Sequence, residues 1–228
     1  MTRIFLLAWI AFGGFALAGE PVAFVNGDPI TRKQLDRATG LAEVVFSLYQ
    51  QFPSFAQSLL LTEEGKAFLS RYELDVLEKL VLRQIQIQEA RRRGLAVDED
   101  EVAKRAQDAL ARVCAHYGLT EDEFAAQLLA QGSSLDQYRE IIAREYREKL
   151  LIAALKSSVL AEIEVDDEEI QAYYDADPGR FVDDDGNTLP LAEVRERVAA
   201  LLRLDKEGAH WLDWLRHARE RAQVEINL

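Results

Sequence analysis

Two short stretches at opposite ends of the chain place the tightest limit on its fold. Residues 22–25 read Val-Ala-Phe-Val, a β-branched and aromatic run typical of a strand, and an Asn-Gly-Asp-Pro turn follows it. A lone strand leaves its backbone N–H and C=O groups unpaired, so it needs a partner strand. The comparable stretch is residues 224–228, at the far end. The sequence therefore predicts that the N- and C-terminal strands pair and enclose everything between them in one unit.

A repeated helix-start signal predicts that the rest of the chain is mostly α-helical. In this signal a capping residue is followed three positions later by Glu or Gln, just before apolar residues at helical spacing. It occurs at Thr31/Gln34, Asp98/Glu101, Thr120/Glu123, Ser134/Gln137 and Asp166/Glu169. We expect a multi-helix module with a small β-hairpin-like pairing of the terminal strands. Its helices are predicted near residues 31–49, 66–93, 98–117, 120–131, 134–160 and 166–177, with a last helix or helix pair from residue 190.

The predicted helix over residues 66–93 differs from the others in its apolar pattern. Its apolar side chains go round most of the helix, which is typical of a central, buried element. The preceding segment, residues 46–61, is rich in aromatic residues and leucine and is broken by Pro53. This segment fits either core packing or an exposed apolar surface, and the sequence leaves both open.

The charge balance argues against nucleic acid as a partner. The chain holds 27 Lys and Arg against 40 Asp and Glu, giving a net charge of −13. Binding a phosphate backbone requires clustered cations, which this composition does not favour.

The first 18 residues are predicted to be a secretory signal peptide. Arg3 provides a positive start, an apolar run follows, and Ala16-Leu17-Ala18 supplies small residues at the cleavage position. We therefore expect a periplasmic or otherwise extracytoplasmic protein that has no stable membrane insertion after cleavage. Retention of this segment as an uncleaved anchor is the alternative.

Residues that could support catalysis are sparse. The single cysteine, Cys114, cannot form an internal disulfide and is expected to be packed in a helix. Cys114 and His116 are two positions apart, so on a helix they point to different faces. His210 and His217 lack further recognisable ligands, and the acidic clusters at residues 98–101 and 166–169 fit favourable first turns of helices. We predict no catalytic residue, no metal and no cofactor.

Several segments, taken in order, resemble a known family. They are residues 25–31, 77–81, 90–95, 118–124, 134–139 and 165–170, followed by Tyr173-Tyr174. Together they resemble the N-terminal chaperone domain of exported foldases of the SurA and PrsA type. The resemblance covers nearly the whole chain after residue 18, apart from an insertion around residues 50–65.

The resemblance also implies a domain organisation. In the family, a parvulin prolyl isomerase domain follows the segment corresponding to residues 173–181, and a terminal helix then returns to the chaperone module. Here Phe181 is followed within a few residues by Pro190 and the last helix. We therefore expect one chaperone domain over residues 19–228, made of residues 19–181 and 189–228 joined by a short loop, without the parvulin domain.

The function implied by the resemblance is a chaperone that binds unfolded or partly folded exported polypeptides through apolar grooves. Two alternatives stay open: a foldase with prolyl isomerase activity, and a structural homodimer or adaptor of the cell envelope. The residues expected to contact client polypeptides are apolar or aromatic and come from the segment before Pro53, the segment after it and the helix from Ser134. They are Phe46, Tyr49, Phe52, Phe55, Tyr138, Ile142 and Tyr146.

Overall fold

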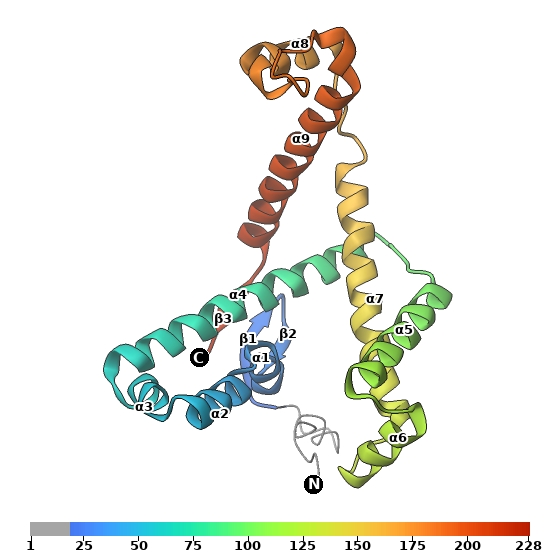
Figure 1. Cartoon of the computed structure of the whole chain (residues 1–228). Helices are drawn as coiled ribbons and strands as arrows, with labels where there is room; N and C mark the ends of the chain where they lie inside the picture. Colours follow the sequence, from blue (N-terminus) through green and yellow to red (C-terminus); the bar gives the residue numbers. More distant parts are fainter. Residues whose placement is uncertain (1–18) are drawn as a thin grey trace. The chain divides into compact units, whose positions relative to one another are not determined.

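The structure is a computed structural model that describes residues 19–228, and the predicted signal peptide lies outside these residues. The described chain divides into two compact units. One unit comprises the described residues up to Ala154 together with Ala222–Leu228, and the other is Leu155–Arg221. The elements are β1 (Pro21–Val25), β2 (Asp28–Thr31), α1 (Arg32–Thr39), α2 (Leu41–Gln51), α3 (Pro53–Leu61), α4 (Glu63–Arg92), α5 (Glu99–Tyr117), α6 (Glu121–Ala130), α7 (Leu135–Leu160), α8 (Asp167–Ala176), a 3-10 turn (Pro178–Arg180), α9 (Leu191–Arg221) and β3 (Val224–Ile226) (Figure 1).

The terminal strands pair and the rest of the described chain is mostly α-helical, and both findings confirm the predicted fold class. The sheet has the order β2-β1-β3, and β1 pairs antiparallel with β3 through Ala23 opposite Ile226 and Val25 opposite Val224. The turn before β2 reinforces this closure, because the backbone N–H of Asn26 donates to the Gln223 carbonyl at 2.8 Å. The Gln223 N–H in turn donates to the Asn26 side chain at 2.9 Å.

Two features near the N-terminus differ from the sequence prediction. The stretch after the turn is a strand, β2, because Asn26 (φ 50°) and Gly27 (φ 88°) form a left-handed two-residue turn that brings residues 28–31 back against β1. The predicted helix over residues 31–49 is two helices, α1 and α2. Gly40 adopts a left-handed conformation (φ 59°) that ends α1 and redirects the chain.

The core of the first unit lies where β1, α1 and α4 meet. Val25, Leu35, Leu77 and Val81 are all fully buried there. Their burial fits the hydrophobic run of β1 and the apolar face of α4. A second cluster joins α5, α6 and α7 and is built on Leu110, Cys114, Phe124 and Leu128.

The second unit has its own core. Ile170 of α8, Phe181, and Val194 and Val198 of α9 form a buried cluster. Between Phe181 and α9 the described chain makes only a small loop, closed by the bridge between Val182 and Thr188. No further domain is therefore inserted at this point of the described chain.

Candidate apolar binding surface

The part of the first unit with the most exposed apolar side chains is a three-helix extension. We call residues 41–75, which form α2, α3 and the first half of α4, the aromatic arm. More than half of the large hydrophobic side chains that are exposed in the described chain belong to it. They are Val44, Phe46, Tyr49, Phe52, Phe55, Leu61, Phe68, Tyr72 and Leu74. Such a grouping of exposed apolar residues is typical of interaction sites.

The composition of the arm explains why it buries so little. Residues 44–62 contain no Asp, Glu, Lys or Arg. Helix α2 has no buried residue, α3 buries only Ala56, and α4 buries only Gly65 before Val76. The sequence predicted a central, buried helix over residues 66–93, and α4 has this character only in its second half, from Val76 onward.

Local signals set the corners of the arm. Phe52 leaves the helical conformation (φ −139°, ψ 66°), and Pro53 then opens α3, where its missing N–H costs nothing. Thr62 caps α4 by accepting a hydrogen bond from the Gly65 N–H at 3.1 Å. The same hydroxyl donates to the Ser58 carbonyl at 2.6 Å, which ties the start of α4 to the end of α3.

The corner between α3 and α4 depends on the absence of a side chain at Gly65. A Cβ at this position would lie 2.2 Å from the Leu59 carbonyl oxygen and 2.7 Å from the Leu59 Cα. The backbones of α3 and α4 therefore meet in direct contact. The glycine fixes the angle at which the two helices present their exposed side chains.

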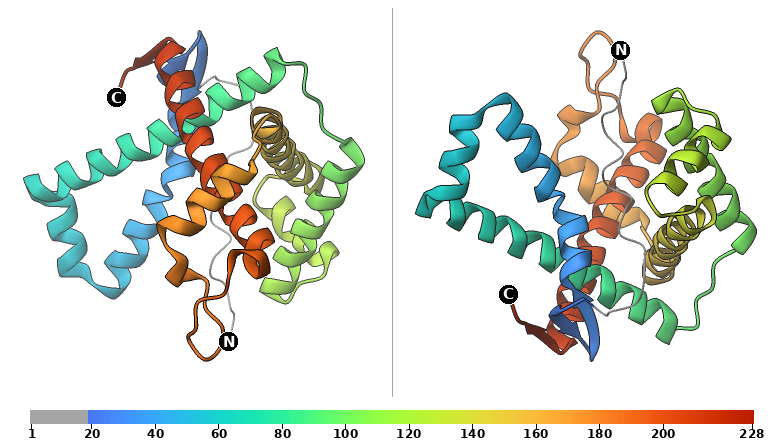
Figure 2. Two further views of the ribbon diagram at one scale, coloured as in Figure 1. Left: turned by 90° about the horizontal axis from the view of Figure 1, so that it is seen from above. Right: turned by 90° about the horizontal axis from the view of Figure 1, so that it is seen from below.

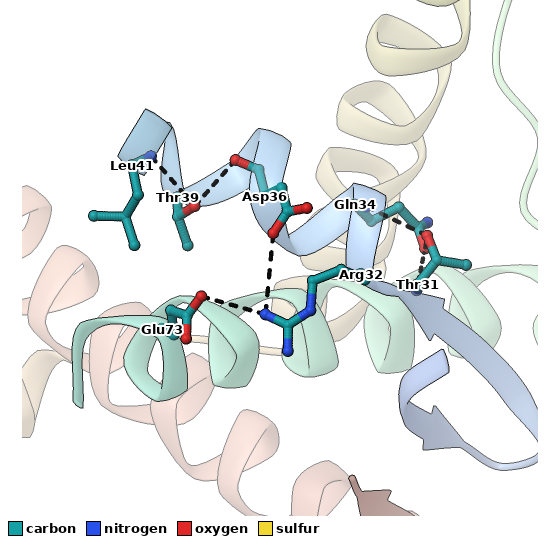
Figure 3. A network of polar contacts seen from close by, with 7 residues as sticks. All are labelled: Thr31, Arg32, Gln34, Asp36, Thr39, Leu41 and Glu73. Carbon is teal, nitrogen blue, oxygen red and sulfur yellow. Dashed lines mark hydrogen bonds and ion pairs between the residues drawn. The ribbon is translucent and has the colours of Figure 1, made fainter. Parts of the chain in front are cut away.

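Polar contacts hold the base of the arm to α1 (Figure 3). The Arg32 guanidinium lies 3.3 Å from the Glu73 carboxylate, and also 4.0 Å from the Asp36 carboxylate. The Tyr72 hydroxyl donates to the Thr39 carbonyl at 3.0 Å. The Thr39 hydroxyl donates to the Asp36 carbonyl and lies 3.4 Å from the Leu41 N–H. These bonds connect the start of α2 and the middle of α4 to the same helix.

The structure separates the seven residues predicted to contact clients into two groups. Phe46, Phe52 and Phe55 are each 59% exposed and Tyr49 is 48% exposed, all on the arm. The other three lie on α7, at the opposite end of α4, where Arg83 of α4 pairs with Glu148 of α7 at 2.8 Å (Figures 1 and 2). The arm and α7 therefore do not form one common surface in this conformation.

The three residues on α7 are less accessible than those on the arm. Tyr138 packs edge-on against Phe124 with ring centroids 5.1 Å apart, and its burial raises the pKa of its hydroxyl. Ile142 is buried. Tyr146 is half-buried, and its hydroxyl accepts a hydrogen bond from Arg112 at 3.0 Å.

Sequence reasoning missed several exposed residues of the arm. Phe68, Leu61 and Val44 are 63%, 72% and 52% exposed. The available signal was the uncharged run itself. When an apolar stretch is too long for the neighbouring elements to cover, some of its side chains stay exposed to water. That signal does not tell which of the side chains face outward.

Few reactive groups come together in the described chain. Burial raises the pKa of the Cys114 thiol, and the nearby Glu121 carboxylate adds to this, so the thiol stays protonated. Within residues 19–228 no three His, Cys, Asp or Glu side chains are gathered in a way that could hold a metal ion. None of the helices in the same range is both long and apolar enough to cross a bilayer.

Fold and surface together define a class of protein: a helical module, closed by pairing of its terminal strands, that exposes an apolar arm. Residues 20–156 match the family model described as the SurA N-terminal domain. The chain therefore belongs to the SurA N-terminal domain family.

Curated relatives carry chaperone and foldase names. The chain is 32% identical over 161 residues to "Chaperone SurA" of Burkholderia thailandensis, covering 70% of this chain and 31% of that protein. It is 23% identical over 179 residues to "Foldase protein PrsA" of Clostridium botulinum strain Langeland, covering 78% of this chain and 51% of that protein. The chain thus spans about half the length of the PrsA relative and about a third of the SurA relative.

A solved structure shares the fold. It comes from work on PEB4 and Cj1289, described as a virulence factor and a periplasmic protein that are two structurally related SurA-like chaperones in Campylobacter jejuni. The TM-score is 0.52 at 11% identity, over 90% of this chain and 98% of that one. This likeness supports the SurA-like fold.

Proposed function

We propose that this protein is an extracytoplasmic, periplasmic chaperone that binds unfolded or partly folded exported polypeptides through the aromatic arm, without catalysis. The observation that carries the proposal is the concentration of exposed apolar side chains on residues 41–75. The names of the SurA and PrsA relatives support a chaperone role. In this proposal residues 1–18 direct export, and residues 19–181 and 189–228 act as one chaperone module.

The arm suits weak, reversible binding. Complete burial of one Phe or Leu side chain contributes about 1.5–3 kcal/mol. Several such side chains, less the cost of ordering a flexible client, correspond to an affinity in about the micromolar range. Such a complex dissociates without an energy source, so the chaperone would need no nucleotide.

Aggregation of a chemically denatured outer-membrane-type protein tests the proposal. The natural chain at severalfold excess should suppress light scattering. A variant with Phe46→Ser, Phe52→Ser and Phe55→Ser should lose at least half of this suppression, because these side chains are exposed and their loss leaves the core intact.

A matched control removes exposed apolar side chains elsewhere. Leu129, Leu204 and Leu212 are 74%, 63% and 66% exposed and lie outside the arm. Changing all three to Ser should leave the suppression unchanged. If the natural chain fails to suppress aggregation, or both triple variants lose it equally, the arm is not the client-binding surface. Mass measurement in solution separates this function from a homodimer, in which the arm would be covered by a second copy.

A further inference from the structure

The charges around the arm define a preference among clients, an inference that rests on the proposed client-binding function. The uncharged residues 44–62 are bordered by carboxylates on both sides, Glu43 before them and Glu63-Glu64 after them. The uncharged run of the arm therefore has a carboxylate next to each of its ends in the sequence.

The cations of the arm are already engaged. The Lys66 ammonium lies 2.9 Å from the Glu63 carboxylate, and the Arg71 guanidinium lies 3.1 Å from the Asp75 carboxylate. At the base of the arm, Glu73 is paired with Arg32. A client with acidic groups would have to break one of these pairs to find a cation on the arm.

Two carboxylates of the arm have no ion-pair partner among the described residues. Glu64 is exposed and Glu43 is half-buried, and no Lys, Arg or His of the described residues forms an ion pair with either. Glu43 lies in the first turn of α2 and Glu64 in the first turn of α4. In the sequence, one precedes the uncharged run and the other follows it. A cation on the client could pair with each of them without displacing a Lys or Arg of the arm.

We infer that the arm prefers apolar, aromatic client segments that are flanked by Lys or Arg over the same segments flanked by Asp or Glu. Glu43 and Glu64 are the residues that set this preference, while the aromatic side chains supply affinity without regard to charge. The net charge of −13 acts in the same direction over longer distances, because it repels acidic chains before contact.

Three labelled peptides with one uncharged core of alternating Phe, Tyr and Gly test the inference. The first has neutral ends, the second two Lys at each end and the third two Glu at each end. Fluorescence anisotropy at low ionic strength, about 0.01 M, should show the Lys peptide binding about tenfold tighter than the Glu peptide. The ratio should fall below about twofold at 0.5 M salt, where the screening length is only a few ångströms.

The variant pair Glu43→Gln with Glu64→Gln should reduce this ratio to about threefold or less and leave the neutral peptide unaffected. Asp100→Asn with Asp122→Asn is the matched control, because this pair removes the same number of charges and both are exposed carboxylates in the first turns of helices, α5 and α6, away from the arm. It should keep the full ratio.

The outcomes separate the inference from the function beneath it. If the neutral peptide binds but the Lys and Glu peptides bind equally, the charge preference is wrong and the proposed function stands. The same holds if the double variant keeps the full ratio. If the neutral peptide does not bind at all, the proposed function itself fails, and the preference fails with it.

Discussion

At the scale of single residues, Gly65 decides how the arm is built. Its backbone conformation is accessible to any residue, so the requirement for glycine comes from contact: a Cβ would overlap the Leu59 carbonyl.

Asn26 has a comparable importance at the other end of α4. Its side-chain amide donates to Gln88 at 2.7 Å while its Oδ1 accepts from the Gln223 N–H, so one side chain joins the β-turn, α4 and the entry to β3.

Gly65→Ala should open the corner between α3 and α4. Forcing a methyl group into a close backbone contact costs about 1–3 kcal/mol. Hydrogen exchange at residues 55–68 should therefore accelerate by about tenfold or more, with little change in the core around Leu77. Gly208→Ala is the control, because nothing lies within 4 Å of a Cβ at Gly208 in α9. Unchanged exchange in the arm of Gly65→Ala would contradict the close contact.

At the scale of elements, α4 is one helix with two roles. Its first half carries the exposed side chains of the arm, and its second half packs against β1 and α1. Glu89 anchors the buried end, accepting hydrogen bonds from the Arg92 and Arg93 side chains at 2.7 and 2.8 Å. Both bonds lower the pKa of Glu89 from 4.5 to about 2, and the bond from Arg92 contributes most.

The Glu89 contacts predict a pH dependence of stability. A lowered pKa in the folded state stabilises the fold above pH 4.5, and this contribution is lost as the pH falls toward 2. Urea unfolding should show Glu89→Gln to be about 1 kcal/mol less stable at pH 7, a value reduced for solvent screening. The difference from the natural chain should shrink below pH 4.5 and vanish near pH 2. Glu162→Gln, at an exposed turn, should show no such trend, and a constant difference for Glu89→Gln would contradict the assignment.

The elements also show which features a single sequence can predict. The capping signals located α5, α6, α7 and α8 closely, because each cap is a local interaction: the reciprocal bonds between Thr120 and Glu123, and between Asp166 and Glu169, are present. The break at Gly40 and the strand β2 were missed. Both depend on left-handed backbone conformations, at Gly40 and at Asn26-Gly27. The same residue types also occur within helices and loops, so the sequence alone does not show that these conformations are adopted.

The candidate surface was predictable only in part, for a physical reason. An aromatic run such as residues 46–55 signals burial or binding equally well, and only the tertiary fold shows that α2 and α3 have nothing to cover them. Conversely, Tyr138 and Ile142 were predicted to contact clients, but Tyr138 packs against the cluster of α5 and α6 and Ile142 is buried. Burial of a helix face is decided by its neighbours, which local patterns do not identify.

At the scale of the whole chain, the first and last strands of the described residues pair, and the first unit carries the arm as an extension. The pairing of β1 with β3 holds the C-terminus against the first strand, as the sequence predicted. The arm, by contrast, is attached through α1 and the second half of α4 and contributes few buried residues. A surface that stability does not require is free to serve binding.

The most direct measurement is site-specific photo-crosslinking to an unfolded outer-membrane-type client. A photoreactive phenylalanine analogue replaces Phe52 on the arm in one variant and Leu129 on α6, which is more exposed than Phe52, in another. Client binding by the arm predicts strong crosslinks from position 52, lost on competition with unlabelled unfolded client, and few from position 129. Equal crosslinking from both positions, or crosslinking from position 129 alone, would contradict it.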